Sequence, residues 1–130
     1  MTVSAVNLIE ETLKEYPDVT YERQENHLVA HPKAPSGFPV EYFFDGTKHI
    51  VSFLGWHEEC DDQQKARACF LFGLSKKCRL QVWKRGGCQY KWIMEFQDES
   101  GTWKGDSVTG LLFFPFWLKK EVFFLQNDLI

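Results

Sequence analysis

The sequence lacks the features that define several large classes of protein. No apolar run approaches the roughly 18 residues of a membrane-spanning helix, and the first residues carry Glu10 and Glu11 where a signal peptide has an apolar middle. There is no glycine-rich phosphate loop, no H-E-x-x-H motif and no Ser-His-Asp spacing. We therefore expect a cytoplasmic protein with no membrane partner, no cofactor and no familiar catalytic motif.

The chain also lacks a large excess of either positive or negative charge. The 15 Lys and Arg residues and 18 Asp and Glu residues give a net charge of −3 at pH 7. This balance creates no overall field that would attract nucleic acid or anionic lipid, so such binding would need a local patch. The cysteines include no C-x-x-C pair, which favours free, mostly buried thiols in a reducing compartment. They are Cys60, Cys69, Cys78 and Cys88.

Aromatic residues, in contrast, are plentiful. The chain has 12 Phe, 5 Trp and 4 Tyr against only 2 Met. Large flat side chains of this kind favour a sheet over a helical bundle. A length of 130 residues predicts a single domain, residues 1–130, with one principal core.

Two segments have helical signals. Apolar residues recur at helical spacing over residues 6–13, and Pro17 forces an end at about Tyr16. Further along the chain, Asp61 and Asp62 supply a cap and an acidic first turn before a second apolar periodic segment. We expect a helix in each segment.

Asp45, followed by glycine, predicts a two-residue hairpin turn between two aromatic-rich strands. This turn places Tyr42 opposite His49 on a mainly apolar face, where we expect His49 to be a hydrogen-bonded core residue. The opposite face is mixed, with Glu41, Phe43, Lys48, Ile50, Ser52 and Leu54.

The segment CRLQVWKRGGCQYKWIMEFQ predicts a second hairpin. A three-residue loop over residues 85–87 would pair Val82 with Tyr90 and keep the apolar residues of both strands on one face. A two-residue loop would place Lys91 opposite Val82, so the face pattern argues against it.

The remaining segments complete an α+β architecture. Residues 102–110 are expected to form a strand with a bulge near Gly105, and EVFFLQ a last strand. The chain is then predicted to hold antiparallel sheet of about eight strands, with two helices packed on apolar faces. Residues 1–55 and 56–130 repeat an α-β-β-β-β pattern without clear residue identity, so either a duplication or coincidence would explain it.

The segment from Trp56 to Asp62 raises the alternative of a metal-dependent or other enzyme. His57, Glu59 and Cys60 are ligand types that a turn could direct at one metal ion. However, nothing nearby in the sequence adds a further His or Cys pair. The favoured interpretation is a solvated acidic entry to the second helix, because acidic residues complement a helix N-terminus.

A second alternative is single-stranded nucleic acid binding on the outward face of the second hairpin. Arg79, Trp83, Arg85 and Lys91 share the odd-numbered positions of that hairpin. Cations beside an exposed Trp can hold phosphates while the ring stacks on a base. An ordinary solvated sheet face has the same composition, and the acidic total makes nucleic acid the less favoured partner.

The stretch TGLLFFPFWLKK holds the densest group of aromatic residues. We expect it to be buried on both faces of the sheet, with pairing that stops at Pro115, because proline cannot donate a ladder hydrogen bond. Partial exposure would make the edge from Leu111 to Leu118 a site of self-association or of binding to another protein. The candidate contact residues are Phe113, Phe114, Phe116 and Trp117.

The favoured function is therefore a non-catalytic module that binds a protein or a small apolar ligand. A ligand pocket between the sheet and the helices would be expected to gather Trp56, His57 and Tyr90.

Overall fold

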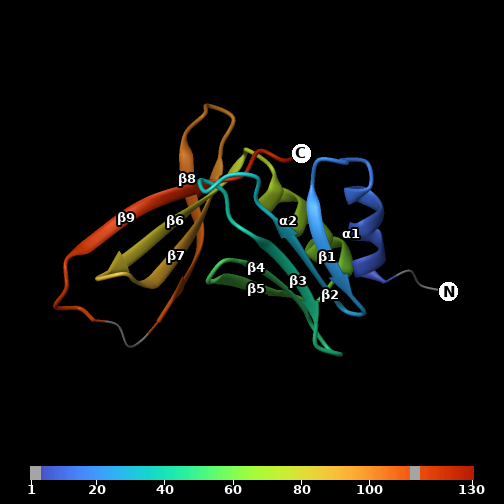
Figure 1. Ribbon diagram of the computed structural model, residues 1–130, viewed down its shortest axis with the longest axis horizontal. Helices are drawn as coiled ribbons and strands as arrows, with labels where there is room; N and C mark the ends of the chain where they lie inside the picture. Colours follow the sequence, from blue (N-terminus) through green and yellow to red (C-terminus); the bar gives the residue numbers. More distant parts are fainter. Residues whose placement is uncertain (1–3, 112–114) are drawn as a thin grey trace.

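The computed structural model describes residues 4–111 and 115–130, and these residues form two helices and nine strands in two antiparallel sheets (Figure 1). The predicted α+β fold is confirmed. Sheet A has the order β1-β2-β3-β4-β5, and sheet B has the order β8-β7-β6-β9. The strands are β1 (Thr20–Gln24), β2 (His27–His31), β3 (Val40–Phe44), β4 (His49–Phe53), β5 (Trp56–Cys60), β6 (Cys78–Arg85), β7 (Cys88–Gln97), β8 (Trp103–Gly110) and β9 (Lys120–Gln126).

Both helices begin at the capping residues that the sequence offers. Helix α1 (Ala5–Leu13) follows Ser4, whose side-chain oxygen accepts a hydrogen bond from the Asn7 backbone N–H. Helix α2 (Gln63–Leu74) follows Asp62, whose carboxylate accepts one from the Gln64 N–H at 2.6 Å. The helix before Pro17 ends earlier than predicted, because the chain tightens into i to i−3 hydrogen bonds after Leu13.

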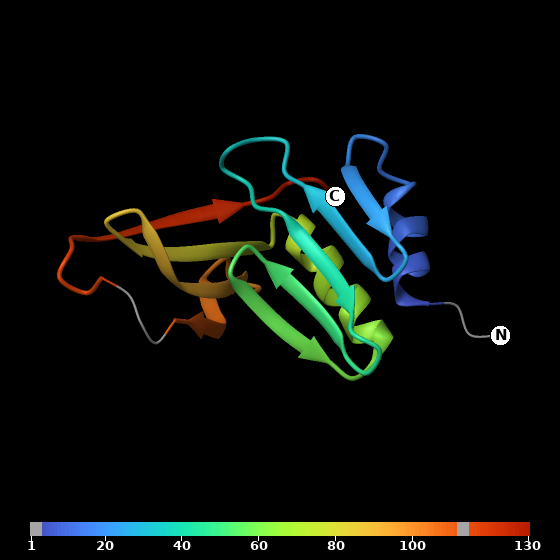
Figure 2. The same cartoon turned by 60° about the horizontal axis from the view of Figure 1, so that its bottom comes forward.

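The two helices cover one face of sheet A, and the other face is open (Figure 2). Helix α2 lies against β3 and β4, where its Gly73 allows close approach: a Cβ atom there would stand 2.4 Å from the Phe53 ring. Helix α1 is tied to β1 by the Glu10 carboxylate, which lies 2.8 Å from Arg23 Nη1. One hydrophobic cluster contains buried residues from both helices and both sheets.

Strand β5 corrects the prediction of an acidic helix entry at Trp56. Leu54 and Gly55 form a two-residue turn, so Phe53 of β4 pairs with Trp56 and the chain returns along the edge of sheet A. The Trp56 side chain is fully buried, and its ring stacks on Phe53 at 4.6 Å between centroids. Its partner across the sheets is Ser107, whose hydroxyl oxygen accepts a hydrogen bond from Trp56 Nε1 at 2.9 Å.

The hairpin at Asp45 has the predicted faces but a different register. Phe44 pairs with His49, so the loop has four residues rather than two. The Asp45 carboxylate accepts hydrogen bonds from the N–H groups of Thr47 and Lys48, which closes the longer loop. The expectation of a hydrogen-bonded His49 is confirmed: its Nδ1 lies 2.6 Å from the Tyr42 hydroxyl.

The hairpin of β6 and β7 has the two-residue turn that the face pattern argued against. Gly86 and Gly87 both have positive φ, 57° and 88°, and Arg85 pairs with Cys88. The apolar residues of both strands still lie on one face, because a bulge at Tyr90 adds one residue to β7. Beyond this bulge Val82 pairs with Trp92. The predicted bulge near Gly105 is also present, since Met94 pairs with Ser107 and Glu95 with Gly105.

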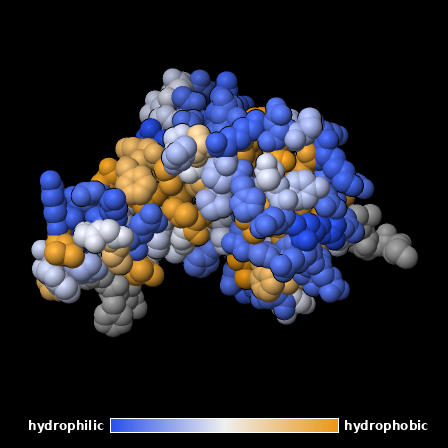
Figure 3. Space-filling view, viewed as in Figure 1, coloured by the Kyte–Doolittle hydropathy of each residue, from blue (hydrophilic) through white to orange (hydrophobic). Residues whose placement is uncertain are grey.

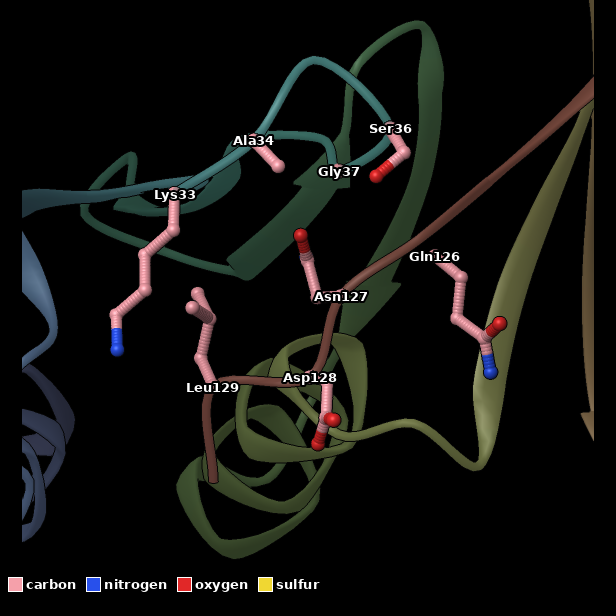
Figure 4. Close-up of a pocket in the computed structure, with 8 residues that line it drawn as sticks. All are labelled: Lys33, Ala34, Ser36, Gly37, Gln126, Asn127, Asp128 and Leu129. Carbon is pink, nitrogen blue, oxygen red and sulfur yellow. The ribbon is translucent and has the colours of Figure 1, made fainter.

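The chain end fastens sheet B to sheet A. Asn127 follows β9 and is 3% exposed. Its side-chain amide donates to the carbonyls of Phe38 (3.0 Å) and Gly73 (2.9 Å) and accepts from the Phe38 N–H at 3.1 Å. Figure 4 shows this side chain directed toward the loop that carries Gly37, beside a pocket of about 140 Å³.

The repeated pattern of the two halves is not a repeat of topology. Sheet A is a five-stranded meander that includes β5, so the boundary lies after Cys60 rather than at residue 55. In sheet B the last strand, β9, returns to pair with β6, which gives a different strand order.

Candidate functional site

Exposed apolar side chains are concentrated on sheet B. Among the described residues, seven of the nine large hydrophobic side chains that are exposed lie within residues 108–124. Figure 3 shows apolar patches over the part of the molecule formed by sheet B. The seven are Val108, Leu111, Phe116, Trp117, Leu118, Val122 and Phe124. Apolar groups gathered in this way mark interaction surfaces more often than isolated ones do.

Phe116, Trp117 and Leu118, here called the aromatic tip, lie in the connection between β8 and β9. These strands are the two edges of sheet B, and residues 115–119 of the connection lie beside the β6–β7 turn at the far end of the molecule from sheet A (Figure 1). The Phe116 and Trp117 side chains are 70% and 71% exposed. Their rings contact each other edge to face, with centroids 5.2 Å apart.

The backbone of the aromatic tip is held in place although its rings are exposed. The Leu118 N–H donates to the Pro115 carbonyl at 3.0 Å, which closes a turn. Arg85 Nη1 donates to the carbonyls of Phe116 (3.1 Å) and Leu118 (3.0 Å). Leu118 also packs so closely on the hairpin turn that a Cβ atom on Gly86 would lie 2.2 Å from its side chain.

The prediction that this stretch is buried on both faces of a sheet is wrong for its described residues. Leu111, Phe116, Trp117 and Leu118 are all exposed and belong to a connection, not to a strand. Phe113 and Phe114 lie outside the described residues.

The outer face of sheet B, which points away from α2, continues this surface. Strand pairing brings Val108, Ile93 and Phe124 into one cross-strand row and Trp83, Lys91 and Val122 into the next. The side chains of Val108, Val122 and Phe124 are 58%, 40% and 48% exposed. This face therefore presents apolar groups and cations together.

The cations on the outer face of sheet B are already engaged with aromatic rings. The ammonium groups of Lys91 and Lys120 lie 4.4 and 4.6 Å from the centroid of the Trp83 ring. The Arg79 guanidinium lies 4.5 Å from the centroid of Trp103 and 2.9 Å from the Glu95 carboxylate, which offsets its charge. A base could stack on Trp83 only if the ammonium groups moved, which weakens the nucleic acid alternative.

The other predicted site residues differ in their exposure to solvent. Trp56 is buried, and Tyr90 is buried beside Arg85, whose guanidinium lies 5.7 Å from its ring. His57 is exposed at the edge of sheet A, where its backbone N–H donates to the Thr109 hydroxyl oxygen at 3.3 Å. His57 and Glu59 lie on the open face of sheet A and Cys60 on the helix side. Within residues 4–111 and 115–130, no three His, Cys, Asp or Glu side chains are placed to share a metal ion.

Three of the four thiols have little nucleophilic character. All four cysteines are free. Burial raises the pKa of Cys78 to about 12, and burial also raises the pKa of Cys60 and of Cys69 above the ordinary thiol value. The thiolate form that attacks a substrate is therefore disfavoured at these three positions.

A groove on the open face of sheet A is a second candidate site, here called the sheet A groove. It has a volume of about 410 Å³ and is lined by Gln24, His27, Glu41, Phe43, Ile50 and Ser52. His27 Nε2 is hydrogen-bonded to the Glu41 carboxylate, and the His27 ring meets Phe43 edge-on at 6.1 Å. The sequence identified the mixed face but not the groove, because the groove requires β2, β3 and β4 to be neighbours.

No described helix is long and apolar enough to cross a membrane. Comparison of the chain with protein-family models, with curated proteins and with solved structures finds no match.

Proposed function

We propose that this protein is a non-catalytic protein-binding module that docks through the aromatic tip and the adjoining outer face of sheet B. The observation that carries the proposal is the exposure of about 70% of the Phe116 and Trp117 side chains on a backbone that Arg85 holds in place. Aromatic side chains that are exposed yet preorganised are typical anchors of protein interfaces.

The free energy of burying aromatic side chains favours the interpretation of this surface as an interface. Burial of one Phe side chain contributes roughly 1.5 to 3 kcal/mol. Phe116, Trp117 and Phe124 leave this free energy unrealised in the isolated chain, and a partner would recover part of it. A binding role also fits the raised pKa values of the buried thiols, which give little support to thiol catalysis.

Site-specific photo-crosslinking in the cells that express the chain tests the proposal. A benzophenone amino acid replaces Trp117 in one variant and Glu15, an exposed residue of the turn after α1, in a control variant. We expect discrete covalent adducts with protein from position 117 and none from position 15. The same adducts from both positions, or no adduct from position 117, would contradict the proposal.

A further inference from the structure

We infer that the aromatic tip binds the sheet A groove of a second copy of this chain. This inference rests on the proposed function and names its partner. The tip lies at one end of the molecule and sheet A at the other (Figures 1 and 2), so the tip of one copy can fill only the groove of another.

The two surfaces have complementary charge. The aromatic tip is followed at once by Lys119 and Lys120, both exposed. The sheet A groove contains the Glu41 carboxylate, and Glu22 and Glu59 lie on the same open face. Exposed charges of opposite sign attract the two surfaces and set their orientation.

The carboxylates of the groove face are only partly neutralised within the molecule. Lys48 lies 3.0 Å from Glu59 and offsets its charge. Glu41 and Glu22 have only histidines as ion-pair partners among the described residues, namely His27 and His31. The open face of sheet A thus retains negative charge that can attract Lys119 and Lys120, the two residues that follow the aromatic tip.

The sheet A groove also has apolar side chains that can pack against those of the aromatic tip. Phe43, which lines the sheet A groove, is 43% exposed and is one of only two large hydrophobic side chains exposed outside residues 108–124 in the described chain. Ile50 lies beside it in the strand pairing. The groove is open to solvent, and its volume of about 410 Å³ is similar to the roughly 300–1,000 Å³ of known ligand sites. It can accommodate an aromatic side chain of the tip.

Tip and groove are different surfaces, so two kinds of assembly are possible. Two copies related by a two-fold axis can each place a tip in the groove of the other, which gives a closed isologous dimer, or successive copies can add head to tail through heterologous contacts. In either case each copy contributes one tip and one groove.

Complementation between two disabled variants tests this pairing directly. Trp117→Ser disables the tip and keeps the groove, whereas Glu41→Lys disables the groove and keeps the tip. Glu11→Lys, on the exposed side of α1, is the matched control for charge. Circular dichroism and denaturation midpoints establish that each variant is folded.

Sedimentation velocity over a concentration series at low salt is the measurement. We expect wild type and Glu11→Lys to associate, and each disabling substitution to weaken self-association at least tenfold. An equimolar mixture of Trp117→Ser and Glu41→Lys should form a 1:1 complex, because one intact tip meets one intact groove. Raising the salt concentration should weaken every complex, since exposed charges are screened.

Three results would overturn the inference. One is a wild-type protein that stays monomeric at the highest soluble concentration. Another is association that Trp117→Ser abolishes but Glu41→Lys leaves intact, which would place a different surface opposite the tip. The third is a mixture of the two variants that does not associate. Adducts from position 117 to other proteins alone would keep the proposed function and reject the second copy as partner.

Discussion

At the scale of single residues, the Asn127 amide joins distant parts of the chain. It hydrogen-bonds to both backbone groups of Phe38, in the loop between β2 and β3, and to the Gly73 carbonyl in α2. Because these groups are buried, loss of the amide would leave them without water to replace it. The side chain therefore holds the end of β9 on the core.

The isosteric substitution Asn127→Asp should make stability depend on pH. A carboxylate at this position would be buried and would face two carbonyl oxygens, so the pKa of the folded state should rise above the unfolded value of about 3.9. The group then favours folding below that value, and this contribution is lost as pH rises through the folded pKa.

We expect Asn127→Asp to be about 3 kcal/mol less stable than wild type at pH 7 and to lose much less at pH 4. Urea denaturation at the two pH values measures the difference. Asn26→Asp, the same change in an exposed turn, should alter stability little at either pH. Equal losses at both pH values would show that no buried charge forms at position 127.

Leu54 has a backbone conformation that does not suit its side chain. It is the first central residue of the β4–β5 turn and has φ of 59°, where a type II′ turn favours glycine. We expect Leu54→Gly to raise the free energy of unfolding by about 0.5 kcal/mol and Leu54→Val to lower it by about 1 kcal/mol. Thermal and chemical denaturation measure both changes, and a stabilising valine would contradict strain at this turn.

At the scale of elements, the faces of the hairpins were predictable and their registers were not. Alternating apolar residues correctly placed Tyr42 with Val51 and Val82 with Met94 on buried faces. Register depends on loop length and on bulges, which change the pairing without changing the faces. The bulge at Tyr90 is of this kind, because one extra residue restores the alternation that the Gly86–Gly87 turn would otherwise invert.

Strand β5 could not be recognised from its own residues. Trp56 and Cys60 are buried, but the three residues between them are exposed, so the alternation of a half-buried strand is absent. Strand β5 packs against β4, α2, β7 and β8, and the bond of Trp56 to Ser107 joins residues 51 positions apart. Such long-range packing leaves no local signal in the sequence.

Arg85 links the β6–β7 hairpin to the aromatic tip. Replacement by Met keeps an unbranched side chain and removes the donors to the Phe116 and Leu118 carbonyls. We expect Arg85→Met to speed hydrogen exchange of the Leu118 amide about tenfold, equivalent to about 1.4 kcal/mol of local opening. Exchange in β3 and β4 should be unchanged, and mass spectrometry of the fragments measures both. Unaltered exchange at Leu118 would show that Arg85 does not hold the tip.

At the scale of the whole molecule, charge and apolar groups are distributed unevenly. The chain has a net charge of −3, yet Lys91 and Lys120 lie on the outer face of sheet B, while carboxylates line the open face of sheet A. The chain thus has two faces of opposite charge despite its small net charge, an arrangement that would favour contact between these faces of two copies.

The sequence indicated the stretch proposed to bind a partner but not its environment. Its aromatic density identified residues 111–118, whereas the expected burial on both sides of a sheet is wrong for the described residues of this stretch. The reason is topological: β8 and β9 are opposite edges of sheet B, so the described residues between them belong to a connection and not to a strand. Strand order of this kind is set by the whole fold, and the sheet A groove was missed for the same reason.

The free energy of unfolding of the double variant Phe116→Ser/Trp117→Ser tests most directly whether the aromatic tip is a surface for partners. Urea denaturation is performed at a protein concentration low enough for the chain to be monomeric, because association would add stability. We predict a value within about 0.5 kcal/mol of wild type, since both side chains are exposed. A loss of about 3 kcal/mol or more, as expected for two buried aromatic side chains, would show that they belong to the core and would contradict the binding role.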